Sequence, residues 1–188
     1  MNASGRVINQ EVKFTMKNIG CALLLLLVGC ASFRSTDGIP AVKGFDENSY
    51  YGEWYEIARL PDIYETQLTN VTFTYQPKGT RIELVKRGMR ENRERTLTAI
   101  GKFEGPRDVA EFRLSFLYEF DARQRVLWVS EKYDRMIVAG DYFSNLWLLS
   151  RDREVPKSEL DKMLKMCEDW GFDTSKLEYP QLPEQKQK

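Results

Sequence analysis

The segment NVTFTYQ, residues 70–76, alternates apolar and polar side chains at every step. Successive side chains of a β-strand point to opposite faces of a sheet. Val71, Phe73 and Tyr75 would therefore share one apolar face, and the threonines between them would share a polar one. A strand with one apolar and one polar face is typical of an antiparallel sheet that covers a core on one side only. This segment predicts antiparallel β-structure.

Eight short segments of this kind follow one another between residues 51 and 151, with turn residues such as Gly79, Gly105 and Asp121 between several of them. The segments are residues 51–59, 70–76, 81–87, 95–103, 110–117, 125–131, 134–140 and 145–151. This spacing is typical of a meandering sheet, and eight strands can close into a barrel that hides its edges and holds one small ligand. A flat sandwich of two sheets is the alternative.

One helix is predicted after the last strand, at residues 158–170. Ser158 would be its N-cap and Gly171 its C-cap. Apolar residues recur at helical spacing and form one stripe that must be buried. They are Leu160, Met163, Leu164 and Cys167. We expect this stripe to pack against the outside of the sheet.

A short strand is predicted at residues 177–179, followed by a flexible polar tail at residues 181–188. Residues 45–180 would then make up one domain of barrel plus helix. The predicted fold class is all-β with one helix: an eight-stranded antiparallel up-and-down β-barrel with a C-terminal α-helix packed outside.

The composition excludes several kinds of site. Histidine is absent from the 188 residues, which removes the commonest metal ligand and general base. The three cysteines, Cys21, Cys30 and Cys167, are too far apart for a zinc motif. The 28 basic and 28 acidic side chains balance without long runs of either sign, which argues against a nucleic-acid surface. We expect no metal, no cofactor and no enzyme activity.

Residues 1–29 have the pattern of a signal peptide. Lys13 and Lys17 precede an apolar run at residues 19–28, which is shorter than the roughly 20 residues of a membrane-spanning helix. Met16 is an alternative start, because the segment from Met16 to Cys30 is a complete signal by itself.

The apolar run ends in Leu27-Val28-Gly29-Cys30, which resembles a bacterial lipobox. This resemblance implies that Cys30 is acylated and becomes the mature N-terminus. Several acyl chains together hold a protein at a membrane almost permanently, whereas a single chain binds only marginally. Residues 30–44 would form a lipidated spacer. Ala31 stands where, in the similar enterobacterial pattern, an aspartate retains the protein in the inner membrane, so the outer membrane is predicted.

The segment GEWYEIAR, residues 52–59, resembles the GxWYEIA signature of lipocalins, especially the bacterial lipoproteins related to apolipoprotein D. The order of eight strands, a last strand that ends in Arg151, a helix and a short strand supports this resemblance. It implies that Gly52 and Trp54 lie at the closed end of the barrel with Arg151 across the indole ring, a cation–π contact of about 1 kcal/mol. One departure is Lys132, which stands where lipocalins usually carry an acid before a tyrosine.

Glu56 is the unusual residue of this first strand. Strand parity puts Glu56 and Ala58 on the same inward face as Trp54. A buried carboxylate must be hydrogen-bonded or protonated. Glu56 would therefore meet either an internal partner or the polar head of a ligand.

The leading functional hypothesis is a binding protein: a barrel held at the outer membrane, with its domain in the periplasm, that takes up a fatty acid or lysophospholipid. Parity gives a set of inward-facing candidates for the ligand site, to which Glu56 is added. They are Phe73, Tyr75, Phe112, Leu114, Phe116, Trp128 and Trp147. Each of them could instead simply fill the core.

Two other hypotheses stay open. Some lipocalins are enzymes, but here no nucleophile or acid–base pair is evident. The barrel could also be packed and ligand-free and serve as a lipid-tethered adaptor, which a cavity in the barrel would distinguish.

Overall fold

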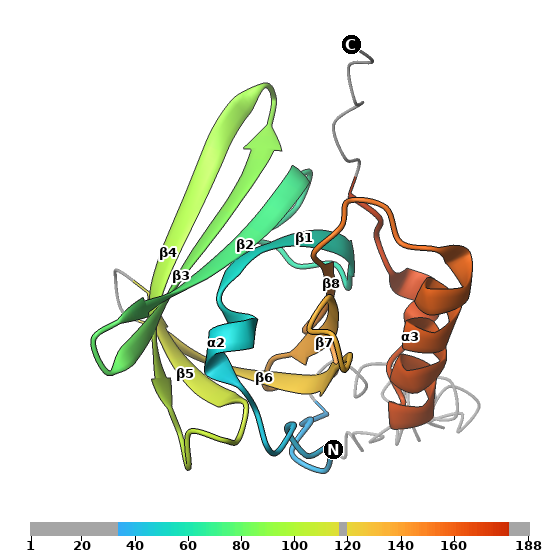
Figure 1. Cartoon of the computed structure of the whole chain (residues 1–188). Helices are drawn as coiled ribbons and strands as arrows, with labels where there is room; N and C mark the ends of the chain where they lie inside the picture. Colours follow the sequence, from blue (N-terminus) through green and yellow to red (C-terminus); the bar gives the residue numbers. More distant parts are fainter. Residues whose placement is uncertain (1–33, 117–119, 181–188) are drawn as a thin grey trace, which may run out of the picture. The chain divides into compact units, whose positions relative to one another are not determined.

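The computed structural model describes residues 34–116 and 120–180. Within these ranges eight strands form a closed barrel in chain order, each antiparallel to its neighbours, and β8 pairs back with β1 (Figure 1). The strands are β1 (Gly52–Arg59), β2 (Thr69–Lys78), β3 (Arg81–Arg90), β4 (Arg93–Phe103), β5 (Glu111–Phe116), β6 (Asp121–Val129), β7 (Arg135–Ala139) and β8 (Leu146–Ser150). The predicted up-and-down barrel is confirmed, and the sandwich is excluded.

The strand boundaries differ from the predicted ones mainly in β6. This strand begins at Asp121, which the sequence suggested as a turn residue, because Asp121 and Ala122 already pair with Ser115 and Leu114 of β5. The hairpin of β3 and β4 is also longer than predicted and pairs from Ile82 to the tip.

A β-bulge changes which face the end of β1 presents. The pairing of β1 with β8 shifts between Glu56 and Ala58, so Ile57 is an extra residue in the ladder. A bulge of one residue reverses the faces of the side chains that follow it. Glu56 lies inside, but Ala58 packs in the outer cluster beneath the helix and Arg59 turns inward. The prediction that Ala58 faces inward is therefore wrong.

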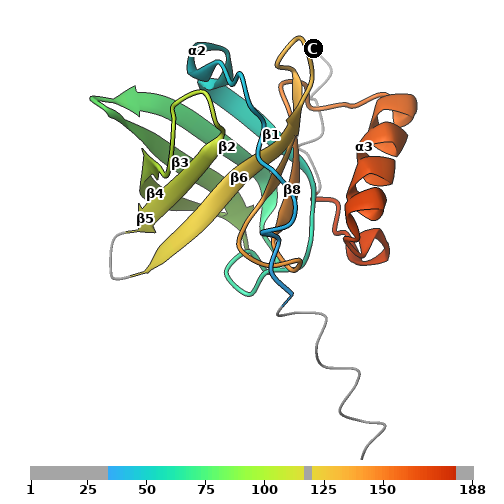
Figure 2. The ribbon, with the colours of Figure 1, turned by 90° about the horizontal axis from the view of Figure 1, so that it is seen from below.

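The apolar residues form two clusters on opposite faces of the sheet. One fills the inside of the barrel around Trp54, Phe73 and Phe112. The other lies between the outer face of the sheet and helix α3 (Lys157–Trp170), which runs beside the barrel in Figure 2. Strands β7 and β8 are buried on both faces and are apolar almost throughout instead of alternating.

Helix α3 buries its predicted apolar stripe. Met163 and Cys167 are fully buried. Burial in this cluster raises the pKa of the Cys167 thiol to about 12. Gly171 ends the helix in the left-handed conformation that glycine adopts without strain. The predicted N-cap is wrong: the helix begins after Pro156, and Ser158 lies inside the first turn.

The last described segment returns to the barrel after the short 3₁₀ helix η2 (Thr174–Lys176). Glu178 forms an isolated antiparallel bridge with Arg59, where a short strand is predicted. Neither helix in the described ranges, α2 (Glu47–Tyr50) or α3, is long and apolar enough to cross a membrane.

Residues 34–44 are part of the folded domain, not a free spacer. Thr36 is fully buried and its backbone N–H donates to the carbonyl of Asp141, 3.0 Å away. The Arg125 guanidinium donates to the Ile39 carbonyl at 2.8 Å, and the Val42 N–H donates to a carbonyl of β6. In Figure 2 this segment passes beside β6. The predicted spacer is thus corrected, and the predicted signal peptide, Cys30 and the tail at 181–188 lie outside the described residues.

Candidate functional site

A cavity of about 620 Å³ opens at the end of the barrel opposite helix α2. Its walls come from the loops that join β1 to β2 and β7 to β8, from the hairpin of β3 and β4, and from the start of β6. A smaller pocket of about 80 Å³ adjoins it on the inside and shares Lys86, Phe116 and Trp147 with it. Together they form a space that is wide at the mouth and narrow and apolar within. We refer to them as the cavity.

Four of the predicted ligand-site residues line this space. Phe73 and Leu114 face the inner pocket, and Phe116 and Trp147 line both parts. These side chains come from β2, β5 and β8, and their inward orientation follows from strand alternation. The edge of the Phe73 ring meets Trp147, with centroids 6.3 Å apart, which fixes one apolar wall.

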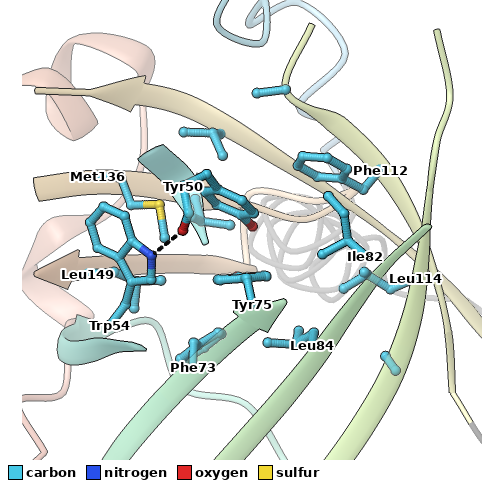
Figure 3. Close-up of a cluster of buried hydrophobic side chains, with 14 of the residues drawn as sticks. Tyr50, Trp54, Phe73, Tyr75, Ile82, Leu84, Phe112, Leu114, Met136 and Leu149 are labelled. Atoms are coloured by element: carbon cyan, nitrogen blue, oxygen red, sulfur yellow. Dashed lines mark hydrogen bonds between the residues drawn. The ribbon is translucent and has the colours of Figure 1, made fainter. Parts of the chain in front are cut away.

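Tyr75 and Phe112 face inward but lie below the cavity. Both pack on Tyr50 of helix α2, with ring centroids 4.3 Å and 5.7 Å from the Tyr50 ring (Figure 3). The Tyr75 hydroxyl donates to Gln124 at 3.2 Å, and burial raises the pKa of Tyr75. Tyr50 and Phe45 come from the segment that crosses this end of the barrel, so these rings form a plug.

Trp128 lies on the outside of the barrel. The pairing of β6 with β7 shifts between Val126 and Trp128, a second β-bulge. Val126 still belongs to the inner cluster, whereas Trp128 packs in the outer cluster beneath α3. Strand parity does not account for this extra residue, so the prediction that Trp128 faces the inside of the barrel is wrong.

Glu56 takes part in a buried ion network behind the cavity wall. It is fully buried, its Oε1 accepts a hydrogen bond of 2.6 Å from Arg59, and its Oε2 lies 3.2 Å from Lys86 Nζ. Lys86 also pairs with Glu65, whose carboxylate accepts from Trp147 Nε1 at 3.1 Å. Of the two partners that the sequence left open for Glu56, the structure provides the internal one.

The positive and negative charges of this network nearly cancel, and its members pair mainly with one another. Burial raises the pKa of Glu56, while the nearby charges of Lys86 and Arg59 act in the opposite direction. Arg59 donates to the carbonyls of Glu65 and Leu68 and pairs with Glu178 at 3.1 Å. These bonds tie the β1–β2 loop to the barrel wall and so shape the cavity.

The sequence did not predict the charged residues in the cavity wall and behind it. Lys86 shares the inward face of β3 with Ile82 and Leu84, a signal that strand parity could have found. Its ammonium lies 4.3 Å from the Phe73 ring centroid, a cation–π contact inside the barrel. Arg59 and Glu65 carry no such signal, because a bulge and a loop set their positions.

Arg123 of β6 is a second cation in the cavity wall. Its guanidinium lies 2.9 Å from a carboxylate oxygen of Asp141, which belongs to the β7–β8 loop, and it also pairs with Asp37 and Glu111. Its charge is therefore matched by neighbours from three segments. In the described ranges, no group of three or more His, Cys, Asp or Glu side chains is placed to hold a metal ion.

The closed end of the barrel is held by Arg151. Its guanidinium carbon lies 3.8 Å from the centroid of the Trp54 ring, and the indole N–H donates to the Tyr50 carbonyl at 2.9 Å. Arg151 also donates to the carbonyls of Ser49, Tyr50, Tyr51 and Glu53, which fastens helix α2 to the barrel. A Cβ on Gly52 would lie 3.1 Å from this guanidinium, and the φ of Gly52 is +106°. Only glycine fits this position without strain.

The loop between β6 and β7 contacts this end despite the departure at Lys132. The hydroxyl of Tyr133 accepts a hydrogen bond of 2.8 Å from the N–H of Asp46. Lys132 itself is exposed. The reversed charge at this position therefore leaves the tyrosine contact in place.

Comparison with known proteins agrees with this architecture. A model of the lipocalin-like domain matches residues 45–182. The outer membrane lipoprotein Blc of Vibrio cholerae is 34% identical over 161 residues, which cover 84% of this chain and 93% of that protein. The protein of the same name from Escherichia coli K12 is 31% identical over 84% of this chain and 91% of its own.

Solved structures with low sequence identity show the same fold. Insecticyanin from the tobacco hornworm Manduca sexta aligns with a TM-score of 0.66 at 18% identity, over 78% of this chain and 85% of its own. Lobster apocrustacyanin A1 aligns with a TM-score of 0.61 at 15% identity, over 78% of this chain and 92% of its own. The matched domain, the relatives above 30% identity and the closed barrel together show that the chain belongs to the lipocalin family.

Proposed function

We propose that this protein binds a single-chain lipid, a fatty acid or lysophospholipid, in the barrel and holds or carries it for membrane maintenance. The observation that carries the proposal is the cavity of about 620 Å³, which narrows to an apolar end at Phe73 and Leu114. Its volume falls in the range of roughly 300 to 1,000 Å³ that is typical of small-molecule sites. A packed adaptor barrel would not need such a space.

The polarity of the walls favours one orientation of the lipid. An acyl chain fits against Phe73, Leu114 and Phe116, where burial of apolar surface drives binding. Arg87, Arg90 and Arg95 line the mouth, where a polar head would stay in contact with water. Lys86 is already paired with Glu56 and Glu65, so the deep wall requires no charge on the ligand.

Lipid titration tests this proposal. Hiding about 300 Å² of acyl chain at about 25 cal/mol per Å² contributes on the order of 7 kcal/mol, which suggests roughly micromolar affinity. The sample is the delipidated compact unit from Ser32 onward, which contains both apolar clusters. We expect saturable changes in tryptophan emission on adding fatty acids or lysophospholipids, with tighter binding for longer chains until the cavity is full.

Trp147 should be the reporter, because Trp54 lies at the closed end and both Trp128 and Trp170 pack in the outer cluster. The control variant Trp147→Phe should therefore lose most of the emission change while it still binds lipid by calorimetry. If no lipid of the series has a Kd below about 100 µM, which corresponds to a binding free energy of roughly 5.5 kcal/mol, the adaptor hypothesis becomes the better account.

We also propose that acylation of Cys30 anchors the protein to the periplasmic face of the outer membrane. The lipobox-like segment LVGC at residues 27–30 supports this, as does the name outer membrane lipoprotein that relatives carry. An anchored barrel would meet its lipid at the membrane surface, and several acyl chains would prevent its loss.

Replacing Cys30 tests the anchor. We expect Cys30→Ser to remove the acyl mass and to deplete the protein from outer-membrane fractions. Cys21→Ser is the matched control, because Cys21 belongs to the predicted signal peptide and should leave with it. An unmodified parent protein, or a Cys30→Ser variant that fractionates like the parent, would refute the anchor.

A further inference from the structure

Exposed apolar side chains gather around the mouth of the cavity. Six large apolar side chains in the described ranges are exposed, and all of them except Tyr179 belong to segments that line the cavity. The other five are Ile63 (81% exposed), Tyr64 (68%), Phe120 (47%), Tyr142 (45%) and Leu97 (44%). They come from the β1–β2 loop, from β4, from the residue before β6 and from the β7–β8 loop. A group of this kind at one end of a barrel marks an interaction surface.

These side chains are continuous with the inside of the cavity. The ring of Phe116, which lines the cavity, stacks on Phe120 with centroids 4.8 Å apart. Phe120 in turn stacks on Tyr64 at 6.0 Å. An apolar path therefore runs from the inner wall across the rim to the outside, which a lipid chain could follow without entering water.

The tip of the β3–β4 hairpin adds basic charge to the same end. Arg87, Arg90, Arg93 and Arg95 lie on it beside only two acids, Glu91 and Glu94. Arg90 donates to the Tyr64 carbonyl at 3.1 Å, so the basic hairpin and the apolar loop are joined. Long arginine side chains beside exposed aromatic rings are suited to a lipid headgroup region, where the guanidinium reaches phosphate and the stem stays apolar.

The first described residues also lie at this end of the barrel. Ser35 bridges to Tyr142 and the Arg34 carbonyl accepts from the N–H of Phe143, both in the β7–β8 loop. Arg34 follows Cys30 by four residues. Four extended residues span at most about 14 Å, so an anchor at Cys30 would keep the mouth within that distance of the membrane. Strands of about ten residues in a tilted barrel rise roughly 25 Å, so the closed end would be farther away.

We propose that the mouth of the barrel docks on the phospholipid surface of the membrane to which Cys30 is anchored. Ile63, Tyr64 and Phe120 enter the boundary between headgroups and acyl chains, and the arginines of the β3–β4 hairpin contact phosphates. The cavity then opens directly onto the bilayer, and a lipid passes between the two along Phe120 and Phe116. The proposal rests on the anchor at Cys30 but not on the identity of the bound lipid.

The test measures the depth of two positions on the acylated full-length protein. Ile63→Cys places a thiol at the mouth, and Lys132→Cys places one in the exposed β6–β7 loop at the closed end. Cys167 is buried, and acylation would consume the thiol of Cys30, so a nitrobenzoxadiazole label goes to the introduced cysteine. The labelled proteins are reconstituted in vesicles of phosphatidylethanolamine and phosphatidylglycerol that contain a nitroxide-labelled lipid.

We expect nitroxide quenching at position 63 to exceed that at position 132 by about threefold or more, with a blue-shifted emission at position 63 only. Equal quenching at both positions, or stronger quenching at position 132, would overturn the docking proposal. Energy transfer between two labelled copies at position 63, without quenching by the lipid, would overturn it in favour of a second copy of the chain as the occupant.

A double variant separates docking from tethering. Ile63→Ser with Tyr64→Ser removes two exposed side chains and should leave stability nearly unchanged. A label at Asn92→Cys on the hairpin tip should then lose about half or more of its quenching, while the acyl mass and flotation with vesicles stay as in the parent. Unchanged quenching in this variant would refute the role of these side chains. Loss of the acyl mass in the parent would instead refute the anchor, whatever the lipid-binding assay shows.

Discussion

Replacing Lys86 by methionine is expected to lower the free energy of unfolding by about 3 kcal/mol at neutral pH, since the buried carboxylates of Glu56 and Glu65 would then share the charge of Arg59. Lys86 pairs with both Glu56 and Glu65, and all three side chains are buried. Methionine fills a similar volume, so the loss comes from the charge and not from a cavity. Chemical denaturation of parent and variant at one pH measures it.

The effect should depend on pH in a defined direction. Burial raises the pKa of Glu56 above its ordinary value in the folded state. A group whose pKa is higher in the folded state than in the unfolded state contributes stability to the fold. That stability is fully present below the pKa of the unfolded state and is lost as the pH rises through the pKa of the folded state. Removing the charge of Lys86 should raise the pKa of Glu56 further, so the destabilisation should grow as the pH rises and should shrink as a falling pH protonates the carboxyl.

Two further variants test this reasoning. Adding Glu56→Gln to Lys86→Met removes one of the two buried carboxylates that would share the charge of Arg59, and should recover part of the lost stability. Lys78→Met is the matched control, because the Lys78–Glu83 pair lies at the surface of the β2–β3 hairpin. Its loss should lower the free energy of unfolding by less than about 1 kcal/mol. A Lys86→Met protein as stable as the parent at every pH would refute the coupling of these charges.

Replacing Arg151 by alanine is expected to cost about 3 kcal/mol of unfolding free energy, because hydrogen bonds from a charged donor and a cation–π contact are lost together. The backbone carbonyls that accept from Arg151 belong to helix α2 and the start of β1. Their loss should loosen the closed end, which lies away from the cavity. Lipid affinity should therefore change much less than stability.

Arg153→Ala is the matched control for Arg151. Arg153 also lies over an aromatic ring, with its guanidinium carbon 4.4 Å from the Tyr55 centroid, but on the outer surface. An exposed cation–π contact contributes about 0.5 to 1 kcal/mol, so the control should lose no more than that. Equal losses for the two variants in thermal or chemical denaturation would refute a special role of Arg151.

The sequence predicted the inside of the barrel best where strand alternation runs without interruption. Phe73, Leu114 and Phe116 line the cavity as parity requires. The rule failed after a bulge, as at Ala58 and Trp128, because one extra residue exchanges the two faces. Strand parity also could not distinguish the residues that form the plug from those that line the cavity. Tyr75 and Phe112 face inward like the others, and only the packing of Tyr50 closes the barrel beneath them.

The sequence by itself determined the number and order of the strands, the helix and its buried stripe, because these depend on periods of two and 3.6 residues that local alternation records. Only the tertiary structure decided how the charges are arranged. Glu56, Arg59 and Lys86 lie on β1 and β3, with β2 between them, and Glu65 lies in a loop. Their pairing depends on sheet register and on a bulge, which bring distant residues within hydrogen-bonding reach. The position of residues 34–36 beside the cavity mouth is set in the same way, because they bond to the β7–β8 loop across more than a hundred residues of sequence.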